Sequence, residues 1–198
     1  MSFRELLLLA LVGWTAVGVV GVTVSLVRGE RAKGLRHLGW IVGVWVVYLA
    51  ALVGTSLMQP QKVVAVEQEQ CFDDMCFAVT GVEEVPGFLI RDGSRLVRVS
   101  VQVSNRERGK TQSEGLIQAY LMDAQGRRWE ESTGVSGVRL RAKVAAGSSV
   151  VSEPVFKVAK DSSGLGLVFT HGRRQPGVLV IGDSDSLWHK RTVVPLGR

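Results

Sequence analysis

Two cysteines separated by four residues, Cys71 and Cys76, form the most specific local motif of this 198-residue chain. Two thiolates could bind a metal ion or be oxidised to a disulfide. A structural metal site needs three or four ligands. The motif supplies two, and His171 and His189 are far away in the sequence. The two aspartates between the cysteines suit a tight turn. A disulfide that closes a hairpin is therefore the favoured prediction, and we expect no metal or other cofactor.

A second cluster near the C-terminus has groups suited to nucleophilic catalysis, because Ser184 and Ser186 precede His189 closely. The run from Gly182 to Leu187 is similar to the Gly-Asp-Ser-Leu block of a hydrolase family. That block belongs at the start of an α/β fold, with its Asp and His near the other end. Here an extra Asp-Ser pair interrupts the block, and it falls in the last expected strands. We interpret the run as a turn.

Other candidate groups do not assemble into a site. The adjacent acids Asp73-Asp74 and Glu83-Glu84 would point to opposite faces of a strand. Gly164-Leu-Gly166 lacks the following helix that a phosphate site requires. No nucleophile, base and orienting group can be combined from what remains. We expect a protein that is not an enzyme.

The elements that must position these residues begin with two uncharged blocks, 6–27 and 38–58. Spanning a hydrocarbon core takes about 20 apolar residues, so the sequence predicts transmembrane helices over 1–27 and 38–58. Buried core helices are disfavoured, because the rest of the chain could not cover two helices that are apolar on all sides. A signal peptide is disfavoured, because residues 1–5 have no net positive charge and no typical cleavage site precedes Arg28.

The loop between the blocks, 28–37, carries four basic residues against one acid, a net charge of +3. Short loops rich in Lys and Arg stay in the cytoplasm, and Arg4 and Glu5 cancel at the N-terminus. The sequence therefore predicts a hairpin in the cytoplasmic (inner) membrane, with the N-terminus and everything after residue 58 outside the cytoplasm. Thiols are oxidised in that compartment. The residues expected to set the topology are Arg28, Arg31, Lys33 and Arg36.

Small residues recur at four-residue spacing in both blocks, as Gly39 with Gly43 and Gly21 with Ser25. Such positions let the backbones of membrane helices approach closely. We favour packing of the two helices within one hairpin over dimerisation. Neither block contains an ionisable acid, base or histidine, so a proton or ion pathway has no residue to rest on.

After a polar linker, 59–62, the hydrophobic pattern changes to period two. In 95–104 the valines at every second position alternate with polar residues, and 138–144 repeats the alternation, as in antiparallel strands with one wet face. Short strands at regular spacing predict an all-β sandwich over 63–198. The other expected strands are 63–70, 77–85, 115–122, 150–158, 165–170, 177–181 and 191–194.

The formal net charge of +6 is divided between these parts. Half of it lies in the loop, and 59–198 carries 19 basic and 16 acidic residues. The remaining charge is dispersed over strand faces, and no aromatic series or reading helix accompanies it, so we expect no nucleic-acid partner. The expected partners are the lipid bilayer and an envelope protein or polymer. The sequence does not predict the oligomeric state.

Residues 62–196 resemble a family of bacterial immunoglobulin-like (telokin-like) domains of unknown function, which follow a lipoprotein signal or membrane segment. The family implies an immunoglobulin-like sandwich outside the cell and brings no catalytic residues. Two helices in place of one anchor depart from the commoner arrangement. The resemblance rests on Val101–Asn105, Tyr120–Arg127, Ala146–Ser148, Pro154–Phe156 and Gly182–Lys190, with the Cys71–Cys76 hairpin as a subgroup feature.

Three functional hypotheses follow. The favoured one is a membrane-anchored, non-catalytic immunoglobulin-like domain that binds or scaffolds at the bacterial cell envelope. The second is an accessory subunit of a membrane complex that acts through its transmembrane hairpin. The third is an envelope hydrolase that uses Ser184 or Ser186 with His189.

Overall fold

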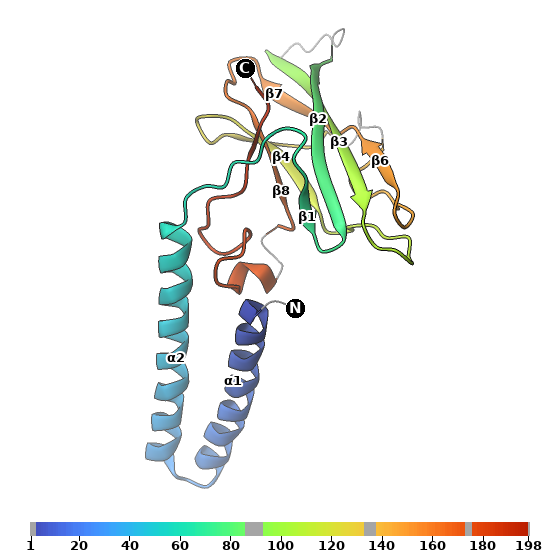
Figure 1. Ribbon diagram of the computed structural model, residues 1–198. Coiled ribbons are helices and arrows are strands. Elements are labelled where there is room, and N and C mark those ends of the chain that lie inside the picture. The colour runs from blue at the N-terminus through green and yellow to red at the C-terminus, as the bar shows by residue number, and fades with distance from the viewer. Residues whose placement is uncertain (1–2, 86–92, 133–137, 173–175, 198) are drawn as a thin grey trace. The chain divides into compact units, whose positions relative to one another are not determined.

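The computed structural model describes residues 3–85, 93–132, 138–172 and 176–197 (Figure 1). The chain divides into two compact units. The first, here called the helical unit, is Met1–Pro60 together with Arg173–Lys190. The second, the β-domain, is Gln61–Gly172 together with Arg191–Arg198. The chain therefore passes from one unit to the other three times.

The helical unit contains two long antiparallel helices, α1 (Phe3–Val27) and α2 (Arg31–Met58), which we call the hairpin. Between them Gly29 adopts a φ of 77°. The backbone N–H of Glu30 donates to the Ser25 carbonyl (2.9 Å), and that of Gly29 donates to the Leu26 carbonyl (3.0 Å). This is a Schellman motif, in which a glycine in the left-handed region satisfies the last carbonyls of a helix. The motif ends α1 and turns the chain directly into α2.

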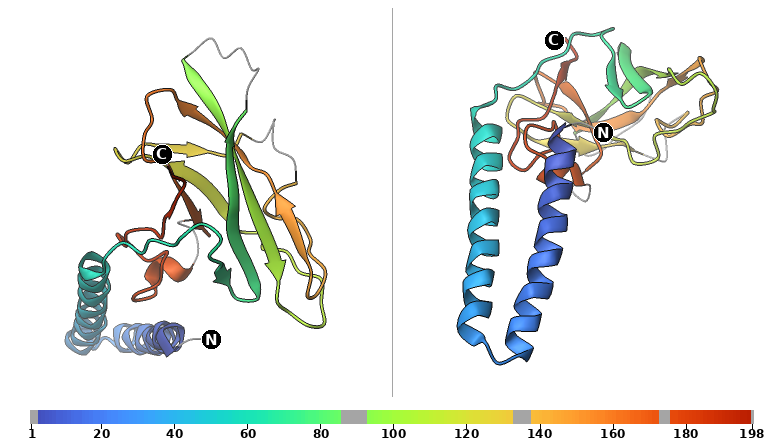
Figure 2. Two further views of the ribbon diagram at one scale, coloured as in Figure 1. Left: turned by 45° about the horizontal axis from the view of Figure 1, so that its top comes forward. Right: turned by 60° about the horizontal axis from the view of Figure 1, so that its bottom comes forward.

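The β-domain consists of two antiparallel sheets (Figure 2). In the first, β3 pairs with β2 along one side and with β6 and β7 along the other. The second sheet has the order β5-β4-β8-β9. The first sheet comprises β1 (Gln70–Phe72), β2 (Met75–Glu84), β3 (Ser94–Asn105), β6 (Ser149–Ser152) and β7 (Val155–Ala159). The second comprises β4 (Gln118–Met122), β5 (Arg128–Glu130), β8 (Gly166–Thr170) and β9 (Val194–Pro195).

One hydrophobic core lies between the two sheets. The valines of β3 at 97, 99, 101 and 103 are all buried, and the residues between them are partly exposed, as the period-two pattern predicts. Phe77 of β2 contacts Phe169 of β8, with ring centroids 5.6 Å apart. Leu121 of β4 belongs to the same cluster. The architecture is a β-sandwich preceded by two apolar helices.

Three expected strands are wrong. In 63–70, Val63 makes an isolated bridge to Val193, a turn follows at 66–67, and only Gln70 belongs to a strand, β1. Residues 138–144 contain a turn at 140–141, and only Val144 makes an isolated bridge, to Gln112. Leu140 and Val144 are buried in the core without a ladder partner, so alternation reports burial here and not sheet pairing. Residues 177–181 form no strand either. A short 3₁₀ helix, η1 (Pro176–Leu179), takes their place in the helical unit.

Other expected strands shift in their limits. The expected strand 150–158 is two strands, β6 and β7, because Pro154 lacks the N–H that a continuous ladder would use. Strand β5 was not predicted, since three residues are too few for a periodic signal. The expected β-sandwich boundary of 63–198 differs from the division of the chain, because Arg173–Lys190 belongs to the helical unit.

Candidate functional site

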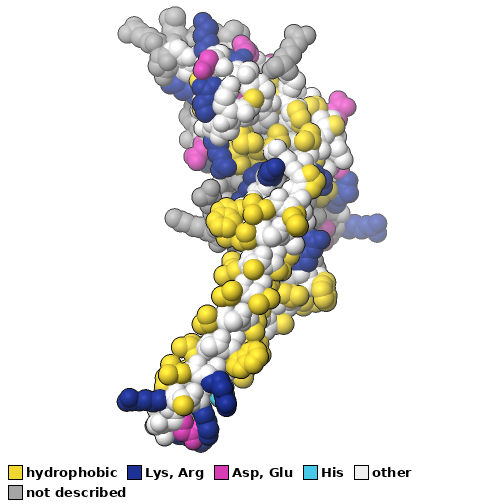
Figure 3. All heavy atoms as spheres, turned by 90° about the vertical axis from the view of Figure 1, so that its left-hand side faces the viewer, with side chains coloured by type: hydrophobic (Ala, Val, Ile, Leu, Met, Phe, Trp, Pro, Cys, Tyr) yellow, Lys and Arg dark blue, Asp and Glu magenta, His cyan; other side chains and the backbone are white. Residues whose placement is uncertain are grey.

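The hairpin presents apolar side chains to its surroundings along its length (Figure 3). Only 11% and 22% of the residues in the most apolar stretches of α1 and α2 are buried. A core helix of a globular protein would be mostly buried. Both helices are long and apolar enough to cross a membrane, although a signal sequence near the N-terminus has the same properties.

The turn of the hairpin carries the four residues expected to set the topology. Arg28, Arg31, Lys33 and Arg36 are all exposed, and Figure 3 shows basic side chains gathered at this end of the helices. The Lys33 ammonium is 3.1 Å from the Glu30 carboxylate. The fold thus concentrates positive charge at one end of an apolar element.

The contact between the helices uses other glycines than those expected. A Cβ on Gly18 would lie 2.9 Å from Ile41 Cδ1, and one on Gly34 would lie 3.1 Å from Leu26 Cδ2. A Cβ on Gly21, Gly39 or Gly43 would meet nothing within 4 Å. Of the four expected packing residues, Ser25 alone is buried in the hairpin, where its Cβ would lie 3.7 Å from a Cβ on Gly34. The spacing identified small residues, but the rotation of each helix decided which of them face the partner.

The segment Pro176–Lys190, here called the 176–190 segment, packs against the open end of the hairpin. Val180 is buried with Leu8, Leu11, Tyr48 and Leu52. The Tyr48 hydroxyl donates to the Leu179 carbonyl (2.6 Å), and an Arg4 Nη1–H donates to the Gly182 carbonyl (2.8 Å). The sequence analysis did not anticipate this docking, although the apolar run Leu179–Ile181 beside a polar turn was a signal for it.

The serines of the hydrolase hypothesis lie in this segment. Ser186 is buried, and its hydroxyl forms a hydrogen bond with the equally buried Ser56 hydroxyl (2.8 Å). Ser184 is exposed. The His189 backbone N–H donates to the Ser186 carbonyl (3.1 Å), and its Nδ1 is buried with no hydrogen-bond partner among the described residues. Ser186 therefore serves to hold the segment against α2.

The predicted disulfide between Cys71 and Cys76 is present. It joins β1 to β2 across a two-residue turn whose first residue, Asp73, has a φ of 52°. Aspartate tolerates this left-handed conformation better than most residues. The Glu69 carboxylate lies within 4.8 Å of both sulfurs, but both thiols are used by the disulfide. The motif staples the edge of the first sheet.

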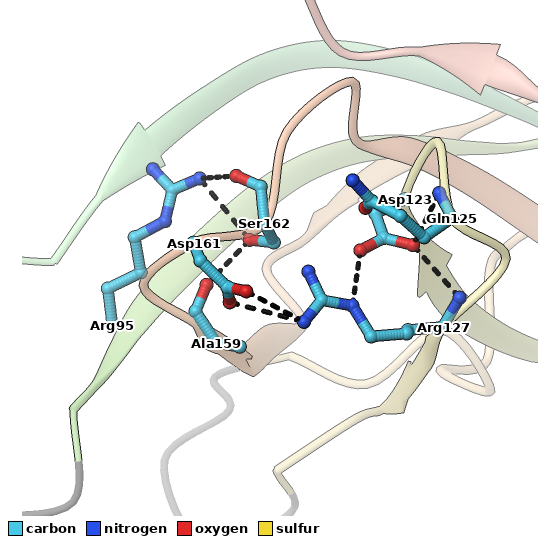
Figure 4. A network of polar contacts seen from close by, with 7 residues as sticks. All are labelled: Arg95, Asp123, Gln125, Arg127, Ala159, Asp161 and Ser162. Carbon is cyan, nitrogen blue, oxygen red and sulfur yellow. Dashed lines mark hydrogen bonds and ion pairs between the residues drawn. The ribbon is translucent and has the colours of Figure 1, made fainter.

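A network of polar contacts ties together two loops of the β-domain (Figure 4). The Arg127 guanidinium donates to Asp123 Oδ2 (2.7 Å) and to Asp161 Oδ2 (3.0 Å). Asp123 Oδ1 also accepts the backbone N–H groups of Gln125 and Arg127 (3.0 and 2.9 Å). Asp123 and Arg127 flank the β4–β5 turn of the second sheet, and Asp161 follows β7 of the first. The network therefore links the two sheets at one end of the sandwich.

Arg127 controls the ionisation of Asp123, whose side chain is 0% exposed. Desolvation alone would raise the pKa of this carboxyl, but the hydrogen bonds from Arg127 and the backbone outweigh it and hold the pKa below its ordinary value. Hydrogen bonds to Asp123 and Asp161 correspondingly raise the pKa of Arg127. This network was not predicted, although an acid and an arginine four residues apart, with a glycine turn between them, were a signal for it.

Basic residues on the first sheet are paired with acids on the neighbouring strand. Arg98 on β3 lies 2.7 Å from Glu83 on β2, and Arg95 pairs with Glu84 in the same way. These cross-strand ion pairs neutralise part of the positive charge that was expected to be dispersed over the strand faces.

An open hollow of about 400 Å³ lies beside β4 and β5. Its lining includes Arg139 and Arg141 together with Glu130 and Glu131. The Tyr120 hydroxyl is buried at its base without a hydrogen-bond partner among the described residues. Two arginines and two glutamates thus line this hollow, and its mixed charge suits a polar or peptide-like contact.

No family model matches the chain, and no curated protein does. Among solved structures it is similar to an uncharacterized β-sandwich protein from Clostridium difficile 630 (9% identity, 70% of this chain and 96% of that one, TM-score 0.45). It is equally similar to MPT63, a secreted protein from Mycobacterium tuberculosis (9% identity, 69% and 98%, TM-score 0.45). A conserved hypothetical protein from Bacillus anthracis follows (13% identity, 54% and 87%, TM-score 0.40). Likenesses this weak carry no argument about function, so the fold class rests on the two sheets described above.

Proposed function

We propose that this chain is a membrane-anchored, non-catalytic protein that displays an immunoglobulin-like β-sandwich on the outer face of the bacterial cytoplasmic membrane. There the β-domain binds or scaffolds an envelope protein or polymer, with the hollow beside β4 and β5, lined by arginines and glutamates, as the contact surface. The N-terminus lies outside the cytoplasm, and the turn of the hairpin lies inside.

One observation carries the proposal. Two antiparallel helices expose apolar side chains over lengths of 25 and 28 residues, and four basic side chains gather at their turn. Water would penalise such a surface by roughly 25 cal/mol for each Å² of apolar area left exposed, whereas a bilayer removes that penalty. The disulfide supports the same topology, because disulfides persist in oxidising compartments.

Cysteine accessibility tests the topology. The native cysteines are bonded to each other, so Glu130→Cys in the exposed β5 strand introduces a single free thiol. We expect a membrane-impermeant maleimide to label it in intact cells.

The matched control is Lys33→Cys in the turn of the hairpin, which should react only after lysis. Labelling of Glu130→Cys only after lysis would contradict the proposed orientation. Extraction of the whole protein by alkaline carbonate would contradict membrane anchoring itself.

The accessory-subunit function remains a second candidate, because Gly39 and Gly43 are open to the surroundings of the hairpin. Another helix could approach closely there. Changing both to leucine should then remove co-purifying membrane proteins, whereas the control Val47→Leu, at another exposed position of α2, should not. An unchanged set of partners in the double variant would count against this function.

A further inference from the structure

We infer that the 176–190 segment is a third membrane-contacting element, which inserts into the outer leaflet beside the hairpin and contacts lipid through Leu179, Leu187 and Trp188. The inference rests on the proposed function, because it requires the hairpin to span a bilayer.

The contacts of the segment fall into two levels along the hairpin. At the first level, Arg4 binds the Gly182 carbonyl and Ser56 binds Ser186. Arg4 and Ser56 lie within two residues of Phe3 and Met58, where the helices end. These polar contacts therefore lie at the depth of the lipid headgroups.

The second level lies deeper. Val180 packs against Leu8, Leu11 and Leu52, and Leu179 is bound by Tyr48. At about 1.5 Å per residue these partners lie roughly 7–15 Å from the helix ends, within the outer half of a core about 30 Å thick. The side chain that the segment buries against the deeper part of the hairpin, Val180, is thus apolar, and the bonds from Arg4 and Ser56 lie near the helix ends.

The backbone of the deeper level is suited to a non-aqueous surrounding. Lipid tolerates irregular backbone only where its polar groups have partners within the protein. Four consecutive carbonyls of the segment, from Gly177 to Val180, each accept a hydrogen bond. The donors are the N–H groups of Val180 (3.0 Å), Leu187 (2.9 Å) and Asp183 (3.3 Å) and the Tyr48 hydroxyl (2.6 Å).

The exposed side chains of the 176–190 segment indicate that lipid covers this surface. Leu179 and Leu187 are each 37% exposed, and Trp188 is 66% exposed. Trp188 lies two residues after Ser186, near the level of the helix ends, where tryptophan is enriched in membrane proteins. Leu187 lies between the two levels, because its backbone N–H donates to the Val178 carbonyl. Trp188 also adopts a φ of 61°, a strained conformation for a bulky residue. Val180 and Ile181, next to Leu179 in the chain, pack in the same hydrophobic cluster as the hairpin residues.

Spin labels on the full chain test the inference. Single cysteines replace Leu187, Val20 in the second half of α1, and Gln125 in the exposed β4–β5 turn, and the native disulfide stays oxidised. The labelled proteins are reconstituted into vesicles of phosphatidylethanolamine and phosphatidylglycerol. Collision with oxygen reports lipid, and collision with a water-soluble nickel chelate reports water. We expect the labels at 187 and 20 to favour oxygen and the label at 125 to favour nickel.

The outcomes separate this inference from the proposed function. A label at 187 that favours nickel as strongly as 125 does, while the label at 20 favours oxygen, would overturn the lipid contact and leave the anchored hairpin standing. Labels at both 187 and 20 that favour nickel would overturn both. A second label at Leu179 should favour oxygen more strongly than the label at 187, because it lies deeper.

Discussion

At the scale of residues, the polar side chains described above hold loops and segments in place and do not assemble into a reactive site. Ser186 is hydrogen-bonded to Ser56, and the two cysteines are oxidised. Asp123 is the clearest case of a residue with a controlled charge, because its enclosed carboxylate receives two backbone N–H groups and the Arg127 guanidinium. Such a carboxylate links the stability of the β-domain to pH.

We expect acid to destabilise the β-domain through Asp123. Because folding lowers the pKa of this carboxyl, its contribution is fully present above the ordinary aspartate range. The contribution is lost as the pH falls through that range toward the lower pKa of the folded state. Asp123→Asn should therefore lower the melting temperature at pH 7 and reduce its fall between about pH 5 and pH 3. Scanning calorimetry of the full chain in detergent micelles measures both.

The matched control is Asp161→Asn, because Asp161 also binds Arg127 but is 74% exposed. Exposed ion pairs contribute little, so this variant should keep both the melting temperature and its pH dependence. Equal effects of the two substitutions would refute the special role of the enclosed carboxylate.

At the scale of elements, short-range constraints decide the hairpins and long-range contacts decide the packing. The β1–β2 hairpin is closed by a two-residue turn and by a disulfide between cysteines five positions apart. The helical hairpin is closed by a glycine motif at residue 29. In both cases a local feature determines the turn, and contacts further along the helices or strands determine which of their faces pack together.

Removal of the disulfide should lower the free energy of unfolding of the β-domain only modestly. Closing so short a loop restricts the unfolded chain only modestly, which corresponds to about 2 kcal/mol in the loop-entropy model. The variant with Cys71→Ser and Cys76→Ser should thus remain folded, with a lower urea midpoint in pulse proteolysis. The reduced wild-type protein should match it, and complete unfolding of either would show that the disulfide carries the fold.

The glycine contacts make a paired prediction for the hairpin. Gly18→Leu places a side chain where even a Cβ lies 2.9 Å from Ile41, so the helices must separate. Overpacking of this kind costs roughly 1–3 kcal/mol, and the melting temperature of the helices in detergent, followed by circular dichroism at 222 nm, should fall. Gly39→Leu adds the same side chain in open space and should change this melting temperature little. The reverse ranking would show that the helices meet through the other face.

At the scale of the whole molecule, two units share one chain in an interleaved order. The helical unit takes in Arg173–Lys190, and the last strand, β9, returns to the β-domain. Each unit has its own hydrophobic cluster. The core of the β-domain uses residues between Val64 and Leu196 but none from the described part of Arg173–Lys190, the 176–190 segment.

The β-domain should therefore fold without the 176–190 segment. Replacing residues 173–190 by a flexible Gly-Ser linker of equal length should leave the pulse-proteolysis midpoint of the β-domain and the Cys71–Cys76 disulfide unchanged. The helices should lose thermal stability, because Tyr48, Ser56 and Leu52 lose their partners. An unfolded β-domain would show that the two units form one cooperative core.

The sequence by itself determined the features that depend on near neighbours: the two apolar helices, the basic turn between them, the alternating burial of β3 and the disulfide hairpin. Apolar length, charge and a short turn are properties of near neighbours, so they can be recognised without knowing the tertiary contacts. Period-two alternation indicated burial in both β3 and 138–144, but it indicated strand pairing only in β3. Only the tertiary structure decided that Gly18 and Gly34 pack while Gly39 and Gly43 remain open, that 138–144 buries side chains without forming a strand, and that 177–181 docks on the hairpin. These outcomes depend on partners distant in the sequence, such as Ile41 for Gly18 and Tyr48 for Leu179, because burial in three dimensions outweighs local preference.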